Sequence, residues 1–233
     1  MGSGVQPGRR DGAILAFIHL FGLSYFAFFL AYFLLHHFPK SPEAIGTAQS
    51  VVLYGGGVIL WSLSSLTYQT LWIFRGDEAA SWRRSELAGA LALIYTTAIP
   101  FVILHFSDHT YLRVAYLSCF TMVTVDKMAQ IITMDLNNLD SDRDFRYHCV
   151  SMGLLALIPP MHRLCQMPKG PPEEAISLIR LAGLFSLGAL CHLTRLPERS
   201  SLVGNWRPSL YMMHLILILN SIWYSKKVLE FSV

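Results

Sequence analysis

Seven long apolar runs divide this chain of 233 residues, and they constrain its fold more than any other feature. The runs cover residues 12–35, 48–74, 85–106, 110–130, 146–166, 173–194 and 207–230. Each is close to the roughly 20 apolar residues that a helix needs to cross a bilayer. Charged residues make up only 14% of the chain, against about a quarter in soluble domains. The sequence therefore predicts a polytopic membrane protein.

Polar joints separate the apolar runs, and each joint combines Pro, Gly, Asn or Asp with charged residues. Backbone N–H and C=O groups inside lipid must be satisfied within the protein, which open-ended strands cannot do. We therefore expect an all-α fold, a seven-transmembrane-helix bundle. In this prediction residues 1–11 form a short cytoplasmic tail, and residues 12–231 form a single transmembrane domain.

The distribution of Lys and Arg predicts the orientation. With a cytoplasmic N-terminus, the inner segments hold eleven of these residues and the outer segments hold seven. Cytoplasmic loops carry the excess of Lys and Arg in membrane proteins, so the N-terminus is predicted to be cytoplasmic. We expect an integral, multi-pass membrane protein, and the sequence leaves the plasma membrane and the endomembranes both open.

Charge and cysteine spacing exclude several other classes. The net charge of +3 is small and scattered, which argues against a nucleic-acid partner. The four cysteines show no Cys-x-x-Cys spacing, so neither a zinc ribbon nor a disulfide framework is indicated. Function has to be sought among the polar residues of the apolar runs.

Four polar residues stand in or at the ends of these runs, where ionisable groups are costly and often functional. Ser65 and Gln69 are four residues apart in the second run and so share one helical face. Glu86 opens the third run, and His214 lies near the entry of the seventh. If neighbouring helices alternate in direction, Gln69, Glu86 and His214 all lie at the cytoplasmic side. They can then converge in one cavity.

Each of these residues also has a purely structural interpretation. Glu86 can stabilise a helix start, where the helix dipole favours a carboxylate and where Arg83 and Arg84 are close in sequence. Gln69 can hydrogen-bond a neighbouring helix, and His214 can be a hydrogen-bonded core histidine. The residues alone leave both interpretations open.

Short motifs add a second line of argument. In chain order they are "FIHLFG" with His19, "SLTYQT", "ELAGALALIYTTAIPFV", "IPPMH", "LTRLPER" and "SLYMMH". Together they resemble the progestin and adiponectin receptor (PAQR) family, which also contains haemolysin III-like proteins. The resemblance covers nearly the whole chain, and the Pro-Glu-Arg junction and "IPPMH" are its most specific parts. The seventeen residues from Gln69 to Glu86 fit the family's interval from His to Asp.

The resemblance implies a zinc ion near the cytoplasmic face, held by one histidine of the second helix and two of the seventh. It also implies an aspartate and a serine beside the zinc-bound water and hydrolysis of lipid amides of ceramide type. Some members are described as hormone or sterol receptors. This chain departs from the pattern because Gln69 and Leu210 replace two ligands and Glu86 replaces the aspartate. Ser65 and His214 are kept.

These departures weaken a zinc site. A catalytic zinc typically has three protein ligands, an amide oxygen is a poor donor, and Leu210 offers no donor atom. We therefore expect no cofactor, with His214 as the remaining metal position of the family. Glu86 and Ser65 are expected to be vestigial or weak catalytic groups. Zinc is kept as an alternative in which His148 or His192 completes a rebuilt site.

Two further features of the sequence have structural interpretations. His162 follows Pro159 and Pro160, and we expect it to support packing at a Pro-disrupted turn. Asp126 and Lys127 stand where the family closes its fourth helix with an Asp-Arg pair. We expect them to form an interfacial ion pair.

The favoured hypothesis is a heptahelical receptor or lipid-responsive regulator with a degraded zinc site. Its ligand is expected to be a membrane lipid or lipid-like molecule, and a protein or hormone ligand is left open. The predicted cavity is lined by Ser65, Gln69, Glu86, Leu210 and His214. The alternative is a zinc-dependent lipid amide hydrolase with substituted ligands. A channel would need more polar mid-helix residues, and the motifs typical of G-protein-coupled receptors are absent.

Overall fold

A computed structural model of the chain describes residues 8–38, 45–136, 141–166, 173–195, 198 and 206–230. Within these ranges the regular structure is helical, and the all-α prediction is confirmed. The long helices are α1 (Arg9–His36), α2 (Ile45–Arg75), α3 (Ala80–His105), α4 (Thr110–Thr133), α5 (Ser141–Gln166), α6 (Glu173–Thr194) and α7 (Pro208–Glu230). A short 3-10 helix, η2 (Gly76–Ala79), joins α2 to α3.

The helix boundaries lie within a few residues of the predicted apolar runs. The largest differences are at N-termini, where polar residues precede the apolar part of the helix. The α1 helix begins at Arg9 because the Asp11 carboxylate accepts a hydrogen bond from the Gly8 backbone N–H at 2.9 Å. A carboxylate in this position satisfies one of the free donors of a helix start. Residues 1–7 of the predicted tail lie outside the described residues.

Among the residues that the structure describes, four helices are long and apolar enough to cross a membrane by length and composition alone, namely α1, α2, α3 and α6. The other three contain more polar residues: α5 begins with Ser-Asp-Arg-Asp, and α7 carries Lys226 and Lys227 near its end. Large apolar side chains nevertheless cover the outside of the bundle. Phe17, Phe28 and Leu35 of α1 are all more than 70% exposed. Such a surface is suited to lipid rather than water.

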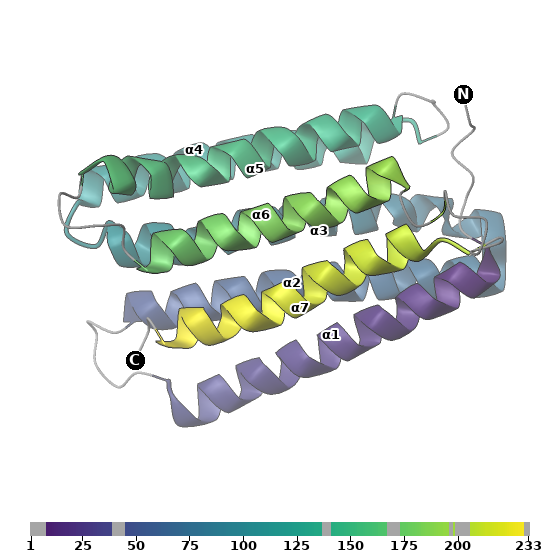
Figure 1. The fold of residues 1–233 in the computed structure, drawn as a ribbon, viewed down its shortest axis with the longest axis horizontal. Coiled ribbons are helices and arrows are strands. Elements are labelled where there is room, and N and C mark those ends of the chain that lie inside the picture. The colour runs from purple at the N-terminus through teal and green to yellow at the C-terminus, as the bar shows by residue number, and fades with distance from the viewer. Residues whose placement is uncertain are drawn as a thin grey trace.

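The helices run side by side along one axis, as Figure 1 shows. The α3 helix is central, because it packs against α2, α4, α5 and α6. The α1 and α7 helices pack against each other and against α2, on the side opposite α4 and α5. This arrangement gathers α1, α2, α3 and α7 around one part of the interior.

Aromatic side chains fill that interior between α1, α2 and α7. The Tyr54 ring of α2 is fully buried and meets Phe26 of α1 and Tyr224 of α7 edge to face, at 6.1 and 5.2 Å between ring centroids. Its hydroxyl donates a hydrogen bond to the Ser221 carbonyl of α7 at 2.9 Å. Buried tyrosines need such a partner for their polar end. The contacts fix the rotation of three helices relative to one another.

A glycine allows the close approach of α2 and α3. A Cβ atom added at Gly57 would lie 1.9 Å from Thr96 Oγ1 and 2.6 Å from Thr96 Cβ, which is far inside van der Waals contact. Small residues at helix interfaces let backbones come together in membrane proteins. The register of α2 against α3, and with it the position of Gln69 opposite Glu86, depends on this contact.

The predicted disruption at Pro159 and Pro160 is wrong, because α5 continues through both prolines to Gln166. Prolines are tolerated in membrane helices when neighbouring helices support the structure. Here the Tyr116 hydroxyl of α4 and the His162 ring of α5 share a hydrogen bond at 2.6 Å, and Phe106 packs near the same ring. His162 therefore packs α5 against α4 within an intact helix.

Candidate functional site

Three polar side chains meet between α2 and α3. Ser65 Oγ and Gln69 Nε2 both donate hydrogen bonds to the same carboxylate oxygen of Glu86, at 3.0 and 3.1 Å. Ser65 is fully buried, Gln69 is 3% exposed and Glu86 is half-buried. Ser65 and Gln69 reach Glu86 together because they are one helical turn apart on the same face of α2.

His214 forms a second polar group with residues of α1 and α2. Its Nδ1 atom lies 2.9 Å from Nε2 of His19, and His19 is completely buried. The Trp61 ring lies parallel to His214 at 6.1 Å and edge-on to His19 at 4.8 Å. Among the described residues, the hydrogen bond of the His214 ring is therefore to α1 and not to Gln69 or Glu86. Because Trp61 precedes Ser65 by one turn of α2, the two polar groups lie next to each other along that helix.

The start of α7 is fixed by contacts at the same end of the bundle. Glu198, from the "LPER" junction, accepts hydrogen bonds from the Ser209 backbone N–H at 3.0 Å and from the Ser209 hydroxyl. Leu210 lies in the first turn and is half-buried, and its backbone N–H donates to the Arg207 carbonyl at 3.1 Å. The Glu198 carboxylate thus satisfies free donors at the start of α7 and interacts favourably with the helix dipole.

The first turns of α1 and α7 are also joined to each other. The Tyr211 hydroxyl donates a hydrogen bond to the Asp11 carboxylate, and the Arg10 guanidinium lies 3.9 Å above the Trp206 ring. Next to them, Gly12 of α1 faces Gln69, and a Cβ atom built there would lie 3.6 Å from Gln69 Oε1. The first turn of α1 thus packs next to Gln69, which belongs to the polar group of α2 and α3.

In the two polar groups formed by Ser65, Gln69 and Glu86 and by His19 and His214, two atoms are buried without a hydrogen-bond partner among the described residues, namely Gln69 Oε1 and His19 Nδ1. Buried polar atoms are nearly always hydrogen-bonded, and each exception calls for an explanation. Gln69 Oε1 can accept a hydrogen bond from a bound molecule. The Nδ1 atom of His19 can accept or donate one, depending on its tautomer.

The family described as haemolysin III-related matches residues 13–220 of the chain. The chain belongs to the haemolysin III-related family. Proteins of this family are seven-helix membrane proteins, so the chain is an integral, multi-pass membrane protein.

A curated relative points the same way. The heptahelical transmembrane protein ADIPOR3 of Oryza sativa subsp. japonica is 30% identical over 148 residues. These residues are 62% of this chain but only 36% of the rice protein. The similarity therefore spans little more than a third of the length of that relative. The predicted resemblance to the family that contains haemolysin III-like and adiponectin receptor-like proteins is confirmed.

The zinc site implied by the resemblance can be tested on the donor atoms present. Gln69, Leu210 and His214 occupy its three positions and offer one imidazole, which is already paired with His19. In the described ranges, no group of three or more His, Cys, Asp or Glu side chains is arranged to hold a metal ion. One imidazole and one amide are a poor donor set for zinc. The residues at these positions do not fit the ion.

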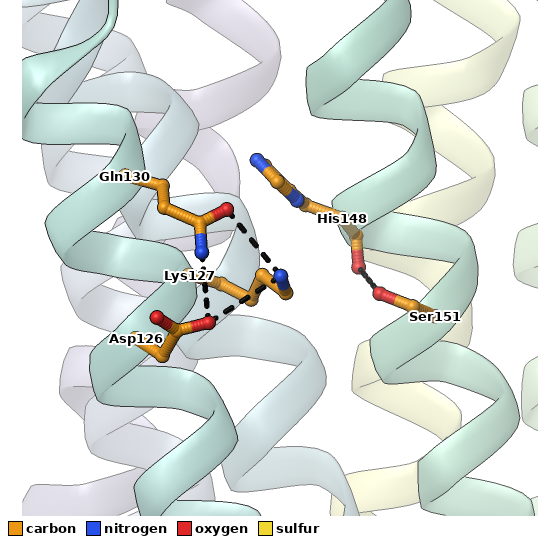
Figure 2. A network of polar contacts seen from close by, with 5 residues as sticks. All are labelled: Asp126, Lys127, Gln130, His148 and Ser151. Atoms are coloured by element: carbon orange, nitrogen blue, oxygen red, sulfur yellow. Dashed lines mark hydrogen bonds and ion pairs between the residues drawn. The ribbon is translucent and has the colours of Figure 1, made fainter.

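His192, one of the two histidines of the alternative site, is close enough to His214 for the two rings to interact electrostatically. His192 lies at the end of α6, where its half-buried ring leaves Nδ1 without a partner among the described residues. His148 of α5 reaches toward α4, as Figure 2 shows, beside the network of Asp126, Lys127 and Gln130. The expected ion pair of Asp126 and Lys127 is present at 3.4 Å. His148 thus belongs to a separate polar region on the far side of α3.

Sequence reasoning missed the roles of His19, Trp61, Glu198 and Asp11. A histidine inside the first apolar run was a usable signal for His19, because lipid-exposed histidines are rare in such segments. The Ser209 contact gives Glu198 of the "LPER" junction a physical role as the partner of the α7 start. Nothing in the sequence pointed to Trp61 or Asp11.

Proposed function

We propose that this chain is a heptahelical receptor or lipid-responsive regulator. Its polar cluster, which consists of Ser65, Gln69, Glu86, His19 and His214, works without a metal ion in this proposal. The observation that carries this proposal is the hydrogen bond from Gln69 Nε2 to Glu86 Oε1 at 3.1 Å. Gln69 stands where the resemblance implies a zinc-binding histidine, and its amide Nε2 donates a hydrogen bond to the Glu86 carboxylate instead. With Leu210 in the second position, His214 is the one imidazole left in the set.

The chemistry of amide hydrolysis argues for the same proposal. A metal ion lowers the pKa of its bound water to about 7 and so supplies a nucleophile at neutral pH. Without it, Glu86 acting as a general base contributes a factor of roughly 10²–10⁴, which is too little for an unactivated amide. Ser65 and Gln69 also both engage Glu86 Oε1, so this oxygen is held by the protein. The cluster is better suited to binding than to hydrolysis.

The proposed ligand is a membrane lipid or lipid-like molecule whose polar end donates hydrogen bonds. Gln69 Oε1 is a buried acceptor with no hydrogen-bond donor among the described residues. A hydroxyl or an amide N–H fits such an acceptor. A chain of methylenes fits the apolar surroundings of α1 and α2.

The test measures two quantities on the same purified protein: the bound zinc per chain and the change in melting temperature when a lipid is added. Elemental analysis is expected to find essentially no zinc, and a stabilising lipid is expected to be recovered uncleaved. Ligand binding raises the apparent stability, so the lipid should raise the melting temperature of the wild type and have less effect on Gln69→Leu. Gln49→Leu, an exposed position of α2, is the matched control and should respond like the wild type.

Two results would overturn the proposal. Close to one zinc per chain, together with cleavage of a lipid amide, would establish the hydrolase. An equal lipid response of Gln69→Leu and Gln49→Leu would show that the lipid does not contact the cluster.

A further inference from the structure

A second polar region lies between α4 and α5, on the other side of α3 from the cluster already described. A pocket of about 430 Å³ opens there between the last turn of α4 and the first two turns of α5. Most of the side chains that line it carry a polar group, among them Gln130, Asp135, Asp144, Tyr147 and His148. None of these residues contributes to the cluster of α1, α2, α3 and α7.

The hydrogen bonds around the pocket fix one of its walls. Gln130 Nε2 donates to Asp126 at 2.8 Å, and Lys127 Nζ lies 3.3 Å from Gln130 Oε1. Figure 2 shows the His148 ring reaching from α5 toward this group. On the α5 side, the Ser151 hydroxyl binds the His148 carbonyl at 3.0 Å. On the α4 side, hydrogen bonds within α4 therefore fix the Gln130 side chain that lines the pocket.

Charges of both signs surround the pocket. The Asp135 and Asp144 carboxylates line it, and the Arg143 guanidinium, from outside the lining, lies 3.8 Å from the Asp144 carboxylate. Lys127 is on the α4 side, paired with Asp126 at 3.4 Å. A ligand with one positive and one negative group matches this mixture better than an anion does. A purely anionic ligand would meet the two carboxylates of the lining.

The position of the pocket in the bundle indicates where such a ligand comes from. The pocket lies at the ends of α4 and α5, and Tyr147, 66% exposed, stands at its edge. Exposed tyrosines at helix ends are typical of the membrane interface. Further along the same helices there are exposed apolar side chains, among them Val125 of α4 and Val150 and Leu154 of α5. A molecule with its head in the pocket would lay its chains on these side chains.

We propose that this pocket binds the head group of a membrane phospholipid that carries a primary amine, of the phosphatidylethanolamine type. The ammonium group donates hydrogen bonds to the Asp144 carboxylate and to neighbouring acceptors of the lining. The phosphate lies toward Arg143, next to Asp144, and the acyl chains follow the outer faces of α4 and α5. A quaternary ammonium group has no N–H to donate, so the site distinguishes ethanolamine from choline head groups.

The experiment measures lipid binding to the delipidated full-length protein in detergent. Phosphatidylethanolamine, phosphatidylcholine and phosphatidylglycerol with identical short chains are titrated, and occupancy is read by native mass spectrometry. We expect the ethanolamine lipid to bind about tenfold more tightly than the other two, which corresponds to one charge-assisted hydrogen bond. Asp144→Asn should remove most of this preference. Asp108→Asn is the matched control, because Asp108 is exposed in the connection between α3 and α4, at the opposite end of α4 from the pocket.

Three outcomes would overturn the proposal. Equal binding of the three lipids would show a non-selective lipid shell, and equal selectivity of Asp144→Asn and Asp108→Asn would place the site elsewhere. Soluble phosphoethanolamine binding as tightly as the lipid would exclude a membrane lipid as the source of the head group. Melting temperatures measured in parallel show that each variant is folded. The readout is independent of zinc and of Gln69, so it stands or falls separately from the proposed function.

Discussion

The pairing of His19 with His214 is the most consequential contact of single residues. A neutral imidazole has one donor and one acceptor nitrogen, so the bond of 2.9 Å requires one ring to donate and the other to accept. Both rings are buried and both contact Trp61. Removing one partner leaves the other without its hydrogen bond in a region that excludes water, and this is costly. The pair therefore joins α1 to α7 through a direct hydrogen bond.

A double-mutant cycle tests this pairing. We expect His19→Ala and His214→Ala each to lower the free energy of unfolding by about 2–3 kcal/mol, from the lost hydrogen bond and the space left behind. The double variant should lose less than the sum, with a coupling energy of about 1–2 kcal/mol. The measurement is denaturant unfolding in detergent, with bound zinc determined in parallel and expected to be unchanged.

The matched control for this cycle is His109→Ala, because His109 is exposed between α3 and α4. It should leave stability close to that of the wild type. Strict additivity of His19→Ala and His214→Ala would contradict a direct bond. A fall in bound zinc on His214→Ala would show that the histidine is a metal ligand.

At the scale of elements, the sequence located the helices well and their contacts less well. The long apolar runs predicted each helix within a few residues, because lipid permits little else. The prolines of α5 misled the prediction, since their effect depends on support from Tyr116 of α4. The rotation of α2 against α3 was also beyond the sequence. It is set by the contact of Gly57 with Thr96, and nothing in the sequence distinguishes Gly57 from Gly56.

These two neighbouring glycines provide an internal comparison. Gly57→Ala places a Cβ atom 1.9 Å from Thr96 Oγ1, so α2 and α3 have to separate or Thr96 has to move. We expect a loss of about 1–3 kcal/mol, typical of overpacking. Gly56→Ala meets nothing within 4 Å and should be neutral or slightly stabilising, since alanine favours the helix. Thermal unfolding of both variants in detergent checks the difference, and equal melting temperatures would contradict the close packing.

At the scale of the whole molecule, the polar cluster collects side chains from α1, α2, α3 and α7. The approach of Gln69 to Glu86 could be anticipated, because consecutive antiparallel helices place these residues at the same end. The bond of His19 to His214 could not, since the residues are 195 positions apart and helix order in space is not written in the apolar pattern. The family resemblance was needed to single out position 210. The roles of these residues in binding or catalysis stay predictions.

The arrangement of α2 and α7 leads to a last prediction, in which two substitutions create a metal site. Gln69→His combined with Leu210→His places three imidazoles at the positions that the family resemblance implies for zinc. Position 69 lies beside Glu86, which can accept a hydrogen bond from the second ring nitrogen and orient the ligand. We expect the double variant to bind close to one zinc per chain, and each single variant to bind much less. The surface pair Gln49→His and Leu219→His, at exposed positions of α2 and α7, is the control and should bind none. A folded double variant with no more zinc than the wild type would show that the ends of α2 and α7 no longer converge as the metal requires.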